Sequence, residues 1–352
     1  MRDSGTRNFN AVPPIRRGND GGRKRIIIAA MIAVAVAIAV FAVLIILEIA
    51  DLGGQKSDGP IKNSVFEGVS FEDRLYSSSD IHKGELLLIN ASFNYVFPDE
   101  TPNFLRCYDT RTVVGKSEKT GNNIYSYYTQ SGATMCARFE PTMLAAFNSL
   151  ADDFYRATGN YDLFIYDEDG YRTYDEQTAK NQKKPADYAP AGQTEHHMGT
   201  SIDLYGNISS SQPIYKIDDP QYASIYKWIY DNAYKYGFVH RYPEAKSGVT
   251  GVTYEPYHFR YVGKAHAEYM TKNNLCLEEY LDLLRDSYGK NSPLYFTGED
   301  GTEYMIYYVA ASTDNLTGIS VPAEGSAGVK YTVSGDNKAG FIVTVEKEAQ
   351  VS

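Results

Sequence analysis

Cysteine is scarce in this chain of 352 residues, which contains only Cys107, Cys136 and Cys276. No two of them have the Cys-x-x-Cys spacing, so a cysteine-rich metal site is excluded. The odd number permits at most one internal disulfide, and Cys107 and Cys136 are the only pair within one region. An oxidising compartment would permit this bond without requiring it, so the sequence leaves open whether the two are bridged.

Positive charge is also scarce, with 34 Lys and Arg against 44 Asp and Glu and a net charge of −10. Residues 1–25 nevertheless hold seven basic and two acidic residues, so the remainder is more acidic than the total indicates. Because phosphate contacts need Lys and Arg, we expect no nucleic-acid partner. The basic, polar segment 1–25 is predicted to be a disordered tail.

Long apolar runs are absent except for one, the 22 residues 26–47. A helix of this length reaches roughly 33 Å, which is enough to cross a bilayer core. The basic flank predicts a cytoplasmic N-terminus and an extracellular body. A cleaved signal peptide is the alternative, but its apolar region is normally about 7–15 residues long. We expect a retained single-pass transmembrane helix, followed by a flexible linker over residues 48–75.

Helical and strand patterns alternate over residues 76–289, where we expect the main domain. A helix is predicted from Pro141, which suits a first helical position, to Gly159, which suits a helix end. Apolar residues recur at helical spacing between them. Further helices are expected over 221–236 and 275–284. Strands are expected over 85–90, 161–166 and 200–204 and at the start of 238–254.

The pattern changes after residue 290. Residues 295–304 predict a hairpin with Asp300-Gly301 near its turn. Two more strands are expected over 330–333 and 340–345. We interpret residues 290–352 as a small β module beside the main domain.

Two short segments carry the candidate chemistry. In the first, residues 194–203, His196 precedes Asp203 by seven positions, with Gly199 giving the backbone freedom between them. In the second, Glu255-Pro256-Tyr257-His258, a glutamate precedes a histidine by three positions. Two imidazoles and one carboxylate can hold a zinc ion with its fourth position open. A separate glutamate beside such an ion is what zinc-assisted hydrolysis needs.

Spacing alone does not decide between this site and solvated loop residues. With six histidines and 44 acidic residues, a histidine followed seven positions later by an acid is expected about once by chance. The context favours a site, because Asp203 lies on a predicted strand and Pro256 keeps Glu255 on extended backbone. His197 competes with His196 as a ligand. His82, His240 and His266 have no partner at an informative spacing and are expected to be structural or exposed.

These segments resemble the VanY-type D-alanyl-D-alanine carboxypeptidases, zinc peptidases that trim bacterial cell-wall stem peptides. The family pattern Ser-x-His-x-x-Gly-x-x-x-Asp is matched from Thr194 to Asp203, and Glu-Pro-Trp-His is matched from Glu255 to His258. An upstream Ser-Gly-Tyr-Arg-Ser-x-x-x-Gln element is similar to residues 169–177. Arg241-Tyr242-Pro243 and residues 259–263 also match. The likeness is good over about 140–270, and the β module resembles extensions of clostridial members.

The resemblance implies an α+β fold of the hedgehog and D-Ala-D-Ala peptidase type, with an antiparallel sheet flanked by helices. It implies Zn²⁺ as the cofactor and peptidoglycan stem peptides as the partners. It favours His196 over His197. It implies that the zinc ligands are His196, Asp203 and His258. It implies that the catalytic base is Glu255. The implied substrate-binding residues are Arg172, Gln177, Thr194 and Tyr257.

Three departures from the family pattern matter. Thr194 replaces Ser and keeps a hydroxyl, and Tyr257 replaces Trp and keeps a ring. Asp169 replaces Ser and places a charge near Arg172, which the family uses for the terminal carboxylate of the substrate. We expect a membrane-anchored zinc D,D-carboxypeptidase outside the cell. An L,D-carboxypeptidase, a wall endopeptidase (favoured if Asp169 neutralises Arg172) and a non-catalytic zinc-containing wall-binding protein are the alternatives.

Overall fold

The computed structural model describes residues 64–100, 102–130, 136–206, 215–326 and 328–348. The expected tail over 1–25 and the transmembrane helix over 26–47 lie outside these residues. None of the helices that the structure describes is long and apolar enough to span a bilayer.

A three-stranded antiparallel sheet stands at the centre of the main domain. Its order is β11 (Phe238–Tyr242), β12 (Glu255–Tyr261) and β8 (Ser201–Asp203). Successive side chains of a strand point to opposite faces of the sheet. The buried rings and aliphatic groups therefore lie on one face, and polar groups lie on the other. His258 lies directly opposite Asp203 in the register of β12 and β8. The sheet itself therefore brings together residues 55 positions apart.

The helix α3 (Pro141–Thr158) packs its apolar face into the core beside this sheet. Glu140 caps its start by accepting a bond from the backbone N–H of Met143 at 2.8 Å. Gly159 ends it at a φ of 72°, a conformation that glycine adopts without strain. The predicted helix over 221–236 is α5 (Ala223–Asn232), continued by the short helix η4 (Ala233–Tyr236).

A second sheet has the order β10 (Tyr215–Lys216), β9 (Tyr205–Gly206), β7 (Leu163–Ile165) and β5 (Tyr128–Thr129). Its pairings are antiparallel except β5 with β7. The fold is thus mixed α and β with mainly antiparallel pairing, close to the expected class. The short elements are η1 (Ser64–Phe66), η2 (Ser78–His82), β2 (Leu105–Arg106), α2 (Cys107–Thr110), β3 (Val113–Lys116), β4 (Asn123–Tyr125), β6 (Arg138–Phe139), α4 (Tyr174–Lys183), η3 (Glu195–Met198), η5 (Glu244–Lys246) and α6 (Ser247–Thr250).

The C-terminal β module contains the predicted hairpin and both predicted strands. Its four-stranded sheet has the order β13 (Leu294–Thr297), β14 (Glu303–Ala310), β17 (Gly340–Lys347) and β16 (Lys330–Gly335). Gly301, in the turn between β13 and β14, has a φ of 81°. A further strand, β15 (Leu316–Pro322), was not anticipated from the sequence.

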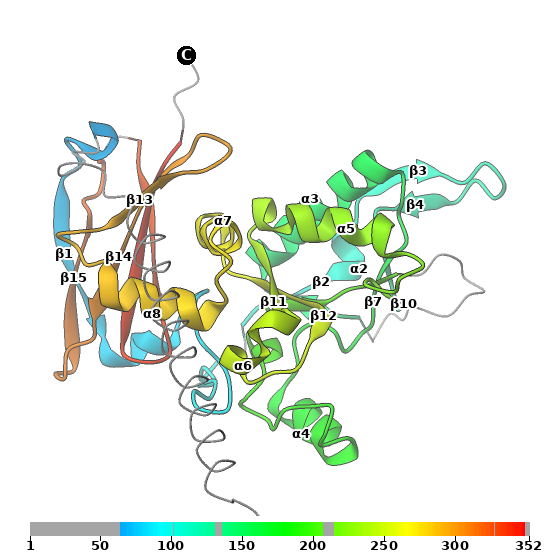
Figure 1. The fold of residues 1–352 in the computed structure, drawn as a ribbon, viewed down its shortest axis with the longest axis horizontal. Coiled ribbons are helices and arrows are strands. Elements are labelled where there is room, and N and C mark those ends of the chain that lie inside the picture. Colours follow the sequence, from blue (N-terminus) through cyan, green and yellow to red (C-terminus); the bar gives the residue numbers. More distant parts are fainter. Residues whose placement is uncertain (1–63, 101, 131–135, 207–214, 327, 349–352) are drawn as a thin grey trace, which may run out of the picture. The chain divides into compact units, whose positions relative to one another are not determined.

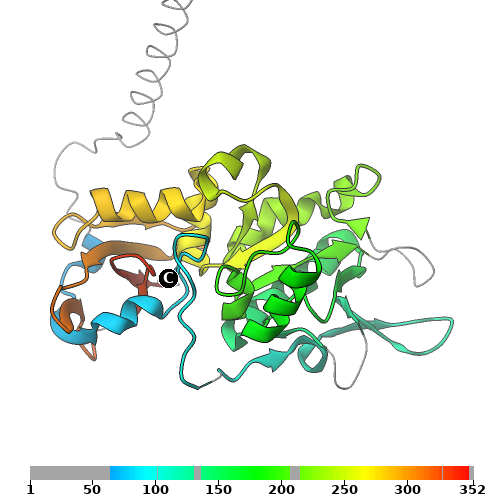
Figure 2. The same cartoon turned by 90° about the horizontal axis from the view of Figure 1, so that it is seen from below.

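The module also includes residues from before the main domain, so residues 71–75 of the expected linker over 48–75 lie in a strand. The first part of that linker, residues 48–63, lies outside the described residues. Strand β1 (Phe71–Ser77) pairs with β15 along its whole length, from Phe71 opposite Pro322 to Ser77 opposite Leu316. Figure 2 shows the blue N-terminal segment among the orange and red strands of the module. Strand pairing between positions this far apart leaves no local signal in the sequence.

Two helices join the module to the main domain. Helix α7 (Lys264–Lys272) and helix α8 (Leu277–Ser287) follow β12 and lie beside the module strands (Figure 1). Leu281 and Leu284 of α8 share one core cluster with Ile306 and Ile342 of the module. The boundary expected at residue 290 therefore runs through a continuous apolar core.

The strand predicted over residues 85–90 is wrong. Residues 86–89 are buried but lie in no strand, because side chains take several of the carbonyls in this segment and the N–H of Leu88 bonds the carbonyl of Asp336 in a loop. Arg260 donates to the carbonyl of Glu85 at 2.7 Å, and Asn337 donates to that of Leu88 at 2.8 Å. An apolar run satisfied by side chains has the same sequence pattern as a strand.

Candidate active site

His196, Asp203 and His258 meet at one point between η3 and the central sheet. Each offers one ligand atom, and these three atoms lie within 4.8 Å of one another. All three side chains are buried. The structure therefore brings together the three ligands predicted from two separate segments.

Hydrogen bonds fix which ring nitrogen of each histidine faces the others. Nδ1 of His196 donates to the carbonyl of Gly170 at 2.8 Å, leaving Nε2 at 3.5 Å from Oδ2 of Asp203. Nδ1 of His258 lies 2.8 Å from Oδ1 of Asp203, and its Nε2 lies 3.5 Å from Oε2 of Glu195. Metal-binding histidines are commonly held in this way, with the second nitrogen on a carbonyl or carboxylate.

His197 cannot take the place of His196. Its Nε2 accepts a bond from the N–H of Gly192 at 3.0 Å, and its Nδ1 donates to the carbonyl of Arg172 at 2.7 Å. Both nitrogens are thus occupied by backbone groups. His197 ties two loops of the site together, and the choice of His196 as the ligand agrees with this geometry.

The short helix η3 presents His196 because its two ends are specified by sequence. The hydroxyl of Thr194 accepts a bond from the N–H of His196 at 3.4 Å and so caps the start. Gly199 ends the helix at a φ of 68°, where a Cβ would lie 2.6 Å from the ring of Phe104. Thr194 therefore has a structural task besides the substrate contact predicted for it.

The protonation states of His196 and Asp203 suit a metal ion. The negative charge of Asp203 outweighs burial and raises the pKa of His258 to about 9, so His258 has to release a proton to bind one. Burial, aided by the positive charge of Arg172, lowers the pKa of His196 to about 4, so its ring is neutral near pH 7. Burial opposes ionisation of Asp203, but attraction to His196 and His258 outweighs it and lowers the pKa of Asp203 well below its usual range. A neutral imidazole and a carboxylate are the forms that bind a metal. Two imidazoles and one carboxylate that leave a position open form a donor set suited to catalytic zinc.

Glu195 is a site residue that the sequence reasoning missed. Its side chain is 1% exposed, and its Oε1 accepts a hydrogen bond from Arg241 at 2.8 Å and forms an ion pair with Arg260 at 3.0 Å. Arg241 also binds Glu278 through two bonds of 2.7 and 2.9 Å. Attraction to both arginines outweighs burial and lowers the pKa of Glu195 well below its usual range. A buried carboxylate thus lies behind the ring of His258. The only indication of it in the sequence was that both arginines lie in segments that match the family pattern.

Glu255 stands at the first position of β12, beside the three candidate ligands. Its Oε2 lies 3.9 Å from Nδ1 of His258, and its side chain is 24% exposed. Burial raises the pKa of Glu255. Nε2 of His240 donates to the carbonyl of Glu255 at 3.0 Å, which holds the backbone in place. A partly exposed carboxylate with a raised pKa is suited to exchange protons with a bound substrate.

Arg172 extends from a loop toward the same pocket. Its Nε donates to the carbonyl of Glu168 at 2.7 Å, and one terminal nitrogen donates to Gln177 at 3.0 Å. The other terminal nitrogen lies 3.5 Å from Oδ2 of Asp203. Gln177 in turn donates to the carbonyl of Ala189 at 2.7 Å, so it positions the guanidinium rather than facing open space.

Asp169 does not take Arg172 away from the pocket. Its carboxylate accepts a bond from the backbone N–H of Tyr166 at 2.9 Å. Burial and the charge of Asp203 raise the pKa of Asp169 well above its usual range, which favours the neutral form. A neutral Asp169 competes weakly for a guanidinium.

These groups line one pocket and a larger neighbouring cavity. Glu255, Arg172 and all three candidate ligands line the pocket, of about 100 Å³. The neighbouring cavity, of about 520 Å³, shares Arg172, Asp203, Glu255 and Tyr257 with it. The ring of Tyr257 stacks on that of Tyr205, with centroids 5.5 Å apart and planes at 16°. Substrate can therefore extend from the candidate ligands along an aromatic wall.

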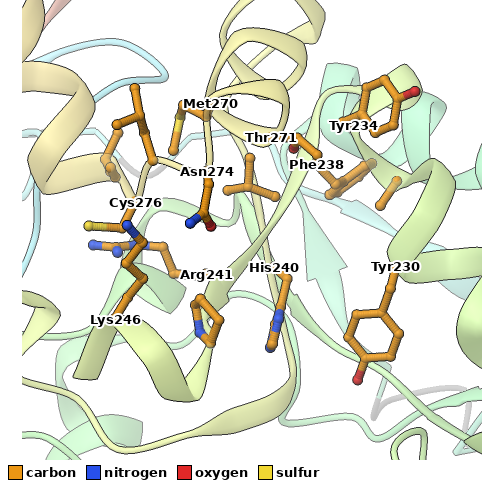
Figure 3. Close-up of a pocket in the computed structure, with 15 residues that line it drawn as sticks. Tyr230, Tyr234, Phe238, His240, Arg241, Lys246, Met270, Thr271, Asn274 and Cys276 are labelled. Carbon is orange, nitrogen blue, oxygen red and sulfur yellow. The ribbon is translucent and has the colours of Figure 1, made fainter. Parts of the chain in front are cut away.

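A separate cavity of about 170 Å³ lies beside β11, between η4 and α7, and none of the three candidate ligands lines it. Figure 3 shows His240, Arg241 and Cys276 along it.

The histidines outside the site are structural, as predicted. His82 bonds Asn337 at 2.6 Å, and His266 bonds Tyr280 at 2.8 Å.

Comparison with known proteins agrees with this geometry. The VanY D-alanyl-D-alanine carboxypeptidase family matches residues 138–264. A D-alanyl-D-alanine carboxypeptidase of Enterococcus faecium is 32% identical over 275 residues, which cover 78% of this chain and 79% of the relative. The chain belongs to the VanY D-alanyl-D-alanine carboxypeptidase family. Membership confirms the predicted resemblance, the predicted class of zinc metallopeptidase and the zinc cofactor.

Other relatives match shorter stretches. The putative carboxypeptidase YodJ of Bacillus subtilis is 38% identical over 126 residues, which cover 33% of this chain and 45% of the relative. Among solved structures, the D,D-dipeptidase VanXYg in complex with a D-Ala-D-Ala phosphinate analog superposes with a TM-score of 0.61. It is 24% identical and covers 79% of this chain and 100% of its own, which shows the shared fold.

Proposed function

We propose that this protein removes the terminal D-Ala from peptidoglycan stem peptides that end in D-Ala-D-Ala. The observation that carries the proposal is the convergence of His196, Asp203 and His258 with Glu255 and Arg172 around one pocket. The first three residues would hold the zinc ion. When bound, the ion supplies a Lewis acid that polarises the scissile carbonyl and lowers the pKa of water.

Arg172 binds the free C-terminal carboxylate of the substrate. Its neighbours Glu168 and Gln177 fix the guanidinium, so it is preorganised for charge-assisted bonds. Recognition of a free terminus makes the enzyme a carboxypeptidase. An endopeptidase would need this position to accept an uncharged continuation of the chain.

Glu255 acts as the general base and then the general acid. It takes a proton from the attacking water and later returns it to the amine of the leaving D-Ala. Its raised pKa brings the two protonation states closer in energy than they are for an exposed glutamate. Tyr257 and Tyr205 supply the wall along which the remaining stem peptide lies.

We also propose that the reaction takes place at the outer face of the cell membrane. Support comes from the apolar run 26–47 and its basic N-terminal flank. Protease added to intact cells should then remove the catalytic domain and spare a tag on residue 1. Protection of both ends would contradict this location.

The activity is tested with residues 54–352 and a pentapeptide ending in D-Ala-D-Ala. One D-Ala should be released per peptide, and a chelator should abolish the release. Glu255→Gln should lower turnover about 10²–10⁴-fold while zinc content is retained. The exposed Glu244→Gln is the matched control. Unchanged turnover in Glu255→Gln would reject the base, and internal cleavage would favour the endopeptidase.

A further inference from the structure

Two of the three cysteines lie side by side outside the zinc site. The sulfur atoms of Cys107 and Cys136 are 3.4 Å apart. Pairing of β2 with β6 places them there, and the N–H of Cys107 donates to the carbonyl of Ala137 at 3.0 Å. Cys276, at the start of α8, has no sulfur partner among the residues that the structure describes. The fold thus selects one pair from three thiols.

The two thiols differ in access and acidity. Cys107 is fully buried, whereas Cys136 is partly exposed on a cavity of about 590 Å³. The backbone N–H of Tyr108 donates to the sulfur of Cys136 at 3.3 Å. The hydrogen bond from Cys107 lowers the pKa of Cys136 to about 6, and the same contact together with burial raises the pKa of Cys107. Cys136 is therefore the accessible thiolate and Cys107 the protected partner.

We propose that Cys107 and Cys136 form a disulfide by exchange with an external disulfide, and that this bond supports the loop carrying Arg172. The Cys136 thiolate attacks one sulfur of the external disulfide and releases the other as a thiolate. Cys107 then loses its proton and attacks the sulfur of Cys136, releasing the second external thiolate. The chain loses two electrons and two thiol protons, and the external disulfide is reduced to two thiols.

The bond is connected to Arg172 through the short strand β6. The carbonyl of Arg138, two residues after Cys136, accepts a bond from the N–H of Tyr171 at 2.8 Å. Gly170 packs so closely there that a Cβ would lie 2.6 Å from the same carbonyl. Cys136 and Arg172 also line the same cavity. Fixing Cys136 to Cys107 therefore restrains the surface on which the residues before Arg172 rest.

The covalent step is tested on the full-length chain without any assay of activity. Incubation with oxidised glutathione should leave one alkylatable thiol and yield a Cys107–Cys136 cross-linked peptide by mass spectrometry. Cys107→Ser should retain a glutathione adduct on Cys136, whereas Cys136→Ser should leave Cys107 unmodified. Cys276→Ser is the matched control and should form the bond. Three alkylatable thiols after oxidation, or equally fast modification in Cys107→Ser and Cys136→Ser, would overturn the proposal.

The support of Arg172 rests on the proposed carboxypeptidase function and is tested separately. Cys276→Ser, oxidised or reduced with a phosphine that cannot bind zinc as a thiol does, is assayed on the D-Ala-D-Ala pentapeptide. Reduction should raise KM several-fold with little change in kcat, and Cys136→Ser should not respond to the phosphine. Equal KM in both forms would remove the connection to Arg172. Absence of any turnover, with the bond formed, would instead reject the proposed function.

Discussion

The main domain and the β module both have apolar cores, but the main domain also buries an ion cluster. Behind the zinc site, Glu195, Arg241 and Arg260 are charged and almost fully buried. The core of the module is built from apolar side chains such as Ile319 and Val343, both with no exposed surface. Apolar packing stabilises a fold without requiring particular contact directions. A buried ion cluster fixes the orientation of its side chains, but removing the charges from water costs free energy. Glu195 of this cluster lies 3.5 Å from Nε2 of His258, so the buried charge is placed to hold that ring in one orientation.

The largest effect is expected when the carboxylate of Glu195, at the centre of the ion cluster, is removed. Glu195→Ala leaves Arg241 and Arg260 buried with a lost partner, and such changes cost about 3–5 kcal/mol of folding stability. It also removes the carboxylate that lies 3.5 Å from Nε2 of His258, so zinc affinity should fall about 10–100-fold. Urea unfolding and competition with a fluorescent zinc chelator measure the two effects.

Glu195→Gln separates charge from shape. It keeps the volume and one acceptor oxygen, so both losses should be smaller than in Glu195→Ala. If Glu195→Ala bound zinc as tightly as the unaltered protein, Glu195 would not orient His258.

The apolar side of the comparison is tested by Ile319→Ala in the module. The side chain is fully buried, and truncation should cost about 2–5 kcal/mol of stability. Because the module has no part in the zinc site, kcat/KM at a temperature where the protein is folded should not change. Leu316→Ala, at a side chain that is 51% exposed, is the control and should cost less than about 0.5 kcal/mol. A large loss of kcat/KM in Ile319→Ala would show that the module acts on the site.

The sequence could predict features that have local signals, and it could not predict features that depend on distant residues. Helix α3 was predictable because Pro141, the apolar spacing and Gly159 are local signals. His196, Asp203 and His258 were found because their blocks match a family pattern. Residues 71–75 of strand β1 were assigned to the linker, because the pairing of β1 with β15 depends on residues about 240 positions away.

The role of Glu195 was missed for a different physical reason. A glutamate beside a histidine predicts nothing by itself, since most glutamates are exposed. Its function depends on two arginines from other strands, which no spacing within residues 194–203 reveals. The predicted strand over 85–90 failed similarly, because Arg260 and Asn337 bind its carbonyls.

A smaller effect is expected where charge meets the substrate rather than the core. Arg172→Gln removes charge-assisted bonds to the terminal carboxylate, which are worth about 1.5–3 kcal/mol. The ratio kcat/KM should therefore fall roughly 10–150-fold, mainly through KM, with zinc content retained. Arg156→Gln, at a side chain that is 70% exposed, is the control. Equal kcat/KM in Arg172→Gln and Arg156→Gln would place carboxylate recognition elsewhere and strengthen the endopeptidase alternative.

The smallest expected effect concerns the cap of helix α4, which carries Gln177. The hydroxyl of Thr173 accepts a bond from the N–H of Glu176 at 3.2 Å, and Glu176 accepts one from the N–H of Thr173 at 2.7 Å. Thr173→Ala should cost about 1 kcal/mol of stability. KM should rise less than in Arg172→Gln, because Gln177 loses order while the guanidinium keeps its charge.

Thr178→Ala separates the cap from the general effect of losing a threonine in this helix. Thr178 bonds the carbonyl of Tyr174 within α4 and caps nothing. If the cap orders Gln177, KM should rise in Thr173→Ala and stay unchanged in Thr178→Ala, and Thr173→Ser should restore it. Equal KM in the two alanine variants would mean that Gln177 holds Arg172 without help from the helix start. Preorganisation of the guanidinium would then depend on the bond to the Glu168 carbonyl, which none of these changes touches.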